Sequence, residues 1–149
     1  MNEMQIPEMP AEIARDEQLA RLIAYPSMVT GGKVNSSAFS LVVLKSGTVE
    51  NYVSVERSTY RIPRKEYYSF SPRKDGDNWI GYASLAVEDV LQTAAGNITT
   101  SVMAHPSKRN RYHAGIHYNN FVLELGDSID PDYQEVTEML AERCAFISF

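Results

Sequence analysis

The sequence predicts a single-domain α+β protein, with one mixed or mainly antiparallel sheet and N- and C-terminal helices packed on it. Three observations favour this class. The 149 residues suffice for one domain with a single core. Apolar residues recur at helical spacing near both ends of the chain. The runs between them are rich in β-branched and aromatic residues, which are typical of strands.

The N-terminal part predicts one helix. Residues 1–8 are expected to be disordered or weakly held, and Pro10 can stand at the start of a helix over residues 11–24. The helix should end before Pro26, because a residue that precedes proline is restricted from helical geometry. Its apolar residues at helical spacing are Ile13, Leu19, Ala20, Leu22 and Ile23.

Strands are predicted in the middle of the chain. The first two are expected to form a hairpin around a turn at Ser46 and Gly47, and the last follows the loop 107–111. The predicted strands are residues 39–45, 50–56, 79–86, 98–104 and 113–125.

Two further helices are predicted after residue 86. Residues 87–95 predict a short helix that Gly96 closes at its C-terminus. Residues 131–144 predict a longer one, because Asp130 is a favourable N-cap, Pro131 suits the first helical position, and an apolar stripe follows.

Composition is that of an ordinary globular protein, with 44% hydrophobic and 22% charged residues. No apolar run approaches the roughly 18 residues that cross a membrane, and the acidic N-terminus does not resemble a signal peptide. A cytoplasmic location without membrane contact is therefore expected. Cys144 lies in an apolar run and is expected to be buried and inert, with a catalytic role as the alternative.

Charge is distributed unevenly, although the net charge is −5. Residues 33–111 carry eleven of the Lys and Arg residues against seven Asp and Glu, and the rest of the chain carries three against twelve. The acidic ends either fold over the basic middle or leave it open to an anionic ligand or a protein partner.

All three histidines, His105, His113 and His117, lie within thirteen residues that also hold several basic side chains. On a strand, His113 and His117 would share a face but lie roughly 13 Å apart, too far to bind one ion. HExxH and CxxC motifs are absent from the sequence. We therefore predict no metal site and no cofactor.

His113 is the candidate catalytic residue, because it follows a basic loop and begins a predicted strand. It could transfer a proton while Lys108, Arg109 or Arg111 holds an anion. Asn110 could then orient the substrate or cap the loop. Alternatively, His113 only fixes the loop by a hydrogen bond to a backbone carbonyl.

Residues 57–74 combine basic and aromatic side chains, a composition that fits nucleic-acid binding. The sequence pI near 5.2 argues against a dedicated nucleic-acid binder. An ordinary loop whose aromatic residues pack on the core is the alternative. The residues concerned are Arg57, Arg61, Arg64, Lys65, Arg73 and Lys74, with Tyr60, Tyr67, Tyr68 and Phe70 between them.

Short motifs over roughly residues 20–118, about two-thirds of the chain, resemble a family of small uncharacterised bacterial proteins. They are Arg21-Leu22-Ile23 with Val34-Asn35-Ser36-Ser37-Ala38-Phe39, Ser54-Val55-Glu56-Arg57, Gly81-Tyr82-Ala83, and Pro106 with Asn110-Arg111-Tyr112-His113-Ala114-Gly115-Ile116. The resemblance implies no activity. It implies that Ser36, Ser37, Arg57, Asn110 and His113 converge in space, while His105, His117 and the acidic C-terminal helix lie outside the pattern.

The leading hypothesis is a non-catalytic interaction or accessory protein of a bacterial system that docks a protein partner, because no complete catalytic signature is present. One alternative is a small enzyme or ligand-binding domain for an anionic, nucleotide-like substrate, which Ser36, Ser37, Arg57, Asn110, Arg109 and Arg111 would bind. The other is a nucleic-acid-associated protein that uses residues 57–74. The sequence identifies neither the partner nor the oligomeric state.

Overall fold

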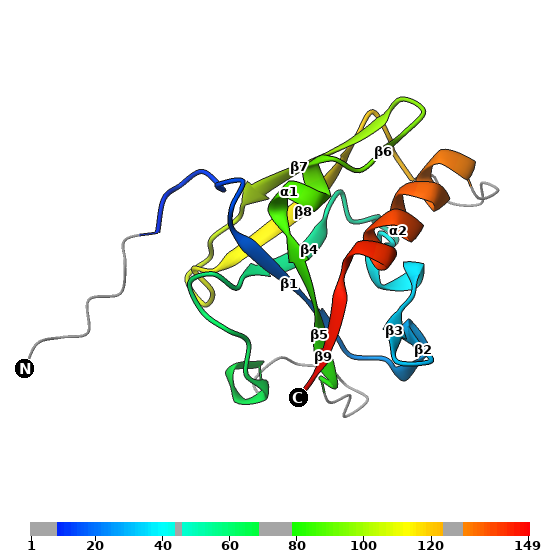
Figure 1. The fold of residues 1–149 in the computed structure, drawn as a ribbon. Coiled ribbons are helices and arrows are strands. Elements are labelled where there is room, and N and C mark those ends of the chain that lie inside the picture. Colours follow the sequence, from blue (N-terminus) through cyan, green and yellow to red (C-terminus); the bar gives the residue numbers. More distant parts are fainter. Residues whose placement is uncertain (1–8, 44–45, 69–78, 124–129) are drawn as a thin grey trace, which may run out of the picture.

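A curled, seven-stranded antiparallel sheet dominates the computed structural model, which describes residues 9–43, 46–68, 79–123 and 130–149 (Figure 1). The strand order is β6-β7-β8-β4-β1-β5-β9. Its strands are β1 (Gln18–Ile23), β4 (Val53–Arg57), β5 (Gly81–Ala86), β6 (Ala94–Ala95), β7 (Ile98–Ala104), β8 (His113–Asn119) and β9 (Ala145–Ser148). A separate small hairpin is formed by β2 (Val29–Thr30) and β3 (Lys33–Val34). The α+β class and the antiparallel sheet are confirmed.

The N-terminal helix is a wrong prediction. Residues 18–23 form β1, which lies between β4 and β5 near the middle of the sheet. Neighbouring Leu19 and Ala20 are both fully buried, as is Ile23. A strand covered on both faces carries apolar residues without strict alternation, so its pattern can imitate helical spacing. Residues 1–8 lie outside the described residues.

Four of the five predicted strands have a counterpart. Residues 98–104 coincide with β7, and β4 and β5 lie within three residues of their predicted bounds at both ends. The strand predicted over 113–125 ends as β8 at Asn119, before Asn120 turns with φ 64°. Residues 124–125 lie outside the described part of the chain.

The strand predicted over residues 39–45 is wrong for its described part. Phe39 ends the 3₁₀ helix η2 (Ser36–Phe39), and only an isolated bridge joins Val43 to Val49. Asn35 caps η2 through its side chain, and this turn buries the Phe39 ring completely. Residues 44–45 are not described.

The C-terminal helix α2 (Pro131–Arg143) is confirmed. The Asp130 carboxylate caps it by accepting the backbone N–H groups of Asp132 and Tyr133. Its buried side chains include Val136 and Leu140, and the helix contacts η2 (Figure 1). The short helix α1 (Val87–Leu91) is confirmed in its first half only, because β6 occupies the end of the predicted range.

Two short 3₁₀ helices complete the described elements, η1 (Pro26–Met28) and η3 (Lys65–Tyr68). In the described residues, every helix is too short or too polar to cross a membrane.

Candidate functional site

A cavity of about 330 Å³ lies beside β1, β4 and the start of β8, next to the loop that joins β7 to β8. One part of its wall is apolar and includes Leu22, Tyr25, Met28 and Trp79. The other part is polar and includes Ser54, Glu56, Arg109, Asn110 and His113. Apolar walls with a few convergent polar groups are typical of small-molecule sites.

His113 is the first residue of β8 and lies directly opposite Glu56 of β4 in the sheet register. Its Nδ1 is 3.0 Å from the carbonyl oxygen of His105. A carbonyl oxygen only accepts hydrogen bonds, so Nδ1 carries the hydrogen and donates it. In the neutral ring, Nε2 is then the basic nitrogen. His113 therefore makes the expected structural hydrogen bond and also lines the cavity.

Glu56 is the buried acid of the cavity, with 4% of its surface exposed. Its two carboxylate oxygens accept hydrogen bonds from the Tyr68 hydroxyl at 3.0 Å and from Asn110 Nδ2 at 2.7 Å. The guanidinium of Arg61 lies 3.5 Å away and compensates its charge. Burial, and then the Glu56 charge, raises the pKa of Tyr68 well above its usual range, so the phenol stays protonated and donates.

Arg61 is itself enclosed by aromatic rings. Its guanidinium carbon lies 4.3 Å from the ring centre of Tyr67 and 4.4 Å from that of Tyr112. This cation–π arrangement and the ion pair with Glu56 join η3 and the 107–112 loop to β4. The polar part of the cavity is consequently built from β4, from η3 a few residues later, and from the 107–112 loop, which is distant in sequence.

His105 and His117 form a pair next to this cavity, with their Nε2 atoms 2.8 Å apart. Their ring centres are 5.1 Å apart, which is the separation expected when two imidazoles point at each other end-on. Such rings share one hydrogen in an N–H···N bond rather than surrounding an ion. The Tyr52 ring stacks on His105 and occupies the space above Gly115. Within the described residues, no group of three metal-ligating side chains occurs.

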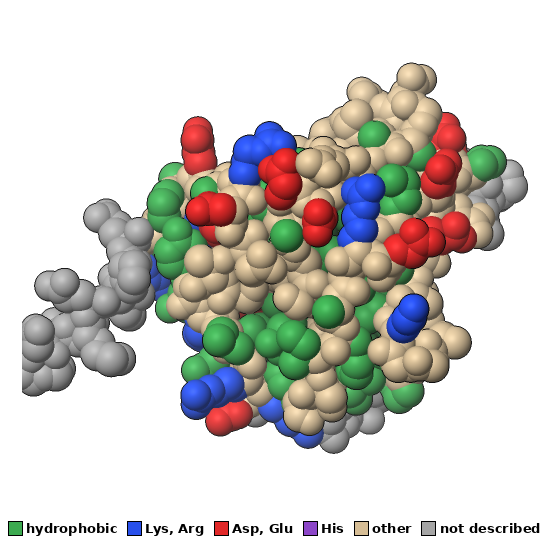
Figure 2. Space-filling model, viewed as in Figure 1, with side chains coloured by type: hydrophobic (Ala, Val, Ile, Leu, Met, Phe, Trp, Pro, Cys, Tyr) green, Lys and Arg blue, Asp and Glu red, His purple; other side chains and the backbone are tan. Residues whose placement is uncertain are grey.

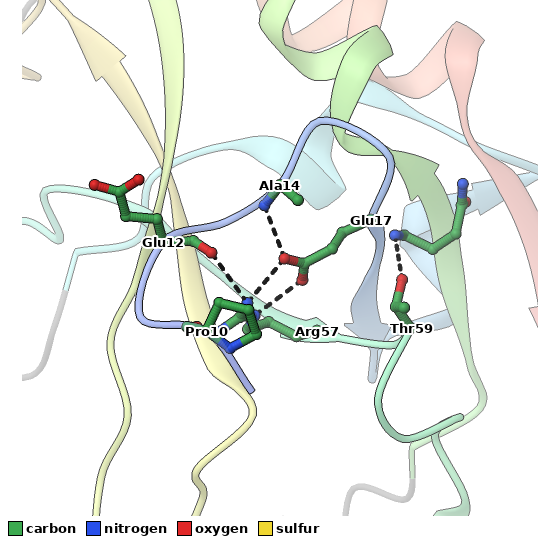
Figure 3. Close-up of polar contacts among 7 residues, drawn as sticks. Pro10, Glu12, Ala14, Glu17, Arg57 and Thr59 are labelled. Carbon is green, nitrogen blue, oxygen red and sulfur yellow. Dashed lines mark hydrogen bonds and ion pairs between the residues drawn. The ribbon is translucent and has the colours of Figure 1, made fainter. Parts of the chain in front are cut away.

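Arg57 lies outside the cavity, in a buried ion pair (Figure 3). Its Nε and a terminal nitrogen donate to the two carboxylate oxygens of Glu17 at 2.9 and 2.8 Å. It also donates to the carbonyl oxygens of Pro10 and Glu12. Because neighbouring residues on a strand point to opposite faces, Glu56 and Arg57 of β4 cannot face one site. Arg57 holds the segment before β1 instead.

The structure does not bring the two serines to the cavity either. Ser36 lines a different cavity, beside α2, and Ser37 hydrogen-bonds the Asn35 side chain. Arg111 is exposed and lies over the ring of Tyr112. The candidate site therefore unites Arg109, Asn110 and His113, and leaves Ser36, Ser37, Arg57 and Arg111 elsewhere.

Sequence reasoning missed the other cavity residues, above all Glu56 and Trp79. No local signal identifies Glu56, because only the pairing of β4 with β8 places it opposite His113. In the basic segment 57–74, Arg64 and Lys65 are exposed, and the part from residue 69 onward lies outside the described residues. Burial raises the pKa of the Cys144 thiol to about 11, which fits an unreactive side chain.

No protein-family model matches the chain, and comparisons with curated proteins and with solved structures found no similar protein.

Proposed function

We propose that this protein is a binding domain for an anionic, nucleotide-like small molecule, held in the cavity that Arg109, Asn110 and His113 line. The observation that carries the proposal is the composition of that cavity. Aromatic and aliphatic side chains form one part of its wall, and a basic loop with a fixed amide and an imidazole forms another. These two chemistries match a ligand with a flat ring and an anionic group.

The apolar wall suits the ring of such a ligand. Trp79 and Tyr25 supply large aromatic surfaces, and Met28 is a flexible side chain that adapts to the shape of a ligand. A volume of about 330 Å³ lies at the lower end of the range for small-molecule pockets. The ligand is therefore small, of the size of one nucleoside rather than of a polymer.

The basic loop suits the anionic group. Arg109 lines the cavity and is exposed, so its guanidinium can form charge-assisted hydrogen bonds with a phosphate or carboxylate. Lys108 is exposed beside it in the chain and adds positive potential to the loop. The Asn110 amide is held by Glu56, which fixes the loop before a ligand binds.

Protein docking by the basic middle of the chain stays a prediction, as do the bacterial and cytoplasmic setting and the nucleic-acid alternative. Two guanidiniums of that region, those of Arg57 and Arg61, are already engaged with carboxylates inside the protein. This reduces the charge that the segment offers to a macromolecule and favours the small-ligand proposal.

The test uses the fluorescence of Trp79, the only tryptophan of the chain. Titration with AMP, GMP, CMP and UMP is expected to change its emission saturably for at least one nucleotide, and the matching nucleoside is expected to bind more weakly. Arg109→Ala should weaken nucleotide binding about tenfold, the equivalent of about 1.4 kcal/mol. Arg111→Ala is the matched control, because Arg111 belongs to the same loop but does not line the cavity.

Either of two results would reject the proposal. One is an emission that stays unchanged with all four nucleotides at millimolar concentration. The other is that Arg109→Ala and Arg111→Ala weaken nucleotide binding equally. The loop would then attract the nucleotide only through its overall positive charge and not through a specific contact of Arg109.

A further inference from the structure

The strand β9 ends the sheet and pairs with β5 alone among the described residues. The N–H of Phe149 donates to the carbonyl oxygen of Ile80. In an antiparallel pair every second residue bonds to the neighbouring strand, so this bond shows which residues of β9 face β5. Residues 145 and 147 therefore direct their backbone groups toward β5, and Phe146 and Ser148 direct theirs away from the sheet. Among the described residues, these outward N–H and C=O groups have no partner strand.

Within the described residues, β3 contacts β9, but the strand itself carries none of the charges or prolines that usually protect an edge. Proteins commonly shield an edge strand with charged side chains, proline, a bulge or a covering segment. The run Ala145-Phe146-Ile147-Ser148 contains neither charge nor proline, and Ile147 is 41% exposed. An uncharged, exposed edge is suited to pairing with another strand.

A groove of about 830 Å³ runs beside β9. One wall belongs to α2 and carries Glu138 and Glu142, and the other belongs to β3 and carries Lys33. Glu138 and Glu142 are both exposed and lie four residues apart, so they share one face of the helix. Figure 2 shows Asp and Glu side chains gathered over α2, with a basic side chain over the β2–β3 hairpin.

We propose that the β9 edge binds an extended segment of a partner protein, which adds a strand to the sheet and directs a Lys or Arg side chain into the groove. Backbone hydrogen bonds to Phe146 and Ser148 supply affinity, and alternate side chains of the added strand reach the groove. The carboxylates of Glu138 and Glu142 outnumber the ammonium of Lys33, so charge complementarity selects a basic side chain.

A second copy of this chain fits the groove less well. Its own β9 residues carry no basic side chain that could reach Glu138 and Glu142. Pairing of two β9 edges would also bring together two acidic α2 helices, and like charges oppose such an approach. The proposed partner site is separate from the nucleotide cavity, and neither proposal depends on the other.

The probes are labelled peptides of about ten residues that alternate Thr and Val and differ only at two central positions on one face. These positions carry Lys, Gln or Glu. Fluorescence anisotropy is expected to rank them Lys, then Gln, then Glu, with the Lys peptide binding at micromolar concentration. Changing both Glu138→Gln and Glu142→Gln should abolish the preference of Lys over Gln.

Ser148→Pro tests the edge itself, because it removes an outward N–H and leaves the ladder with β5 intact. It should weaken the Lys peptide at least tenfold. Ser148→Ala is the matched control, because it keeps that N–H and should bind like the wild type. Circular dichroism of both variants checks that the sheet is retained.

Three outcomes would overturn the proposal. The first is that none of the peptides binds at concentrations up to about 1 mM. The second is that Ser148→Pro binds the Lys peptide as tightly as Ser148→Ala does. The third is that sedimentation shows a wild-type dimer that Ser148→Pro dissociates, which would assign the edge to a second copy of the chain.

Discussion

The buried ion pair between Arg57 and Glu17 should be among the most costly positions to alter. Both side chains are 2% exposed, and two hydrogen bonds join them at 2.9 and 2.8 Å. Arg57→Met would leave the Glu17 carboxylate buried with only the Ala14 N–H as a donor in this cluster. Removing one partner of a buried ion pair costs about 3–5 kcal/mol, because the remaining charge is uncompensated.

This loss is large against the total stability of about 5–15 kcal/mol that is usual for a domain. Glu17→Gln should cost a similar amount, because it leaves the guanidinium of Arg57 without a counter-charge. The double variant, Arg57→Met with Glu17→Met, should cost clearly less than the sum of both single changes, because no charge remains buried.

Urea unfolding followed by circular dichroism measures all three variants against the wild type. Single changes that cost less than about 1 kcal/mol, the value of an exposed ion pair, would refute the reasoning. An additive double variant would refute it as well. Nucleotide binding by the folded fraction should be unchanged in each variant, because Arg57 does not line the cavity.

Three further predictions concern other parts of the fold. Gly115→Ala should lower the free energy of unfolding by about 1–3 kcal/mol in urea, because its Cβ would collide with the Tyr52 ring, and a change near zero would contradict this contact. Asp130→Ala should cost about 1 kcal/mol by removing the cap of α2, whereas Asp130→Asn should cost less, and equal losses would exclude capping as the cause. Burial, followed by a neighbouring histidine, lowers the pKa of both His105 and His117, so the unfolded chain takes up protons more readily and stability should fall as pH decreases from neutral toward 5. Unfolding of a variant with His105→Gln and His117→Gln at several pH values should show a weaker fall, and an unchanged slope would locate the pH dependence elsewhere.

Local signals explain which elements were predictable. The helix α2 carries its own cap, and the strand β7 is rich in β-branched residues and ends before a proline, so both are recognisable from short stretches of sequence. The strand β1 is not, because its apolar residues satisfy helical spacing and strand burial equally. Only the pairing of β1 with β4 and β5 decides between the two.

The same distinction applies to the site. Arg109, Asn110 and His113 are near each other in sequence, so their clustering could be recognised without a structure. Glu56 reaches them through the register of β4 and β8, which no sequence pattern of this chain indicates. The family resemblance implies that Arg57 belongs to the same site, yet Arg57 lies on the other face of β4, where Glu17 compensates its charge.

The most direct test of the nucleotide-binding proposal is an NMR measurement of contacts between ligand and protein. With the nucleotide that binds best in the fluorescence titration, intermolecular NOEs should connect the base protons to the indole of Trp79 and to the ring of His113. The resonances of Arg111 should show no such contact. A bound nucleotide whose base protons give NOEs only to residues outside the cavity would contradict the assignment of this cavity as the binding site.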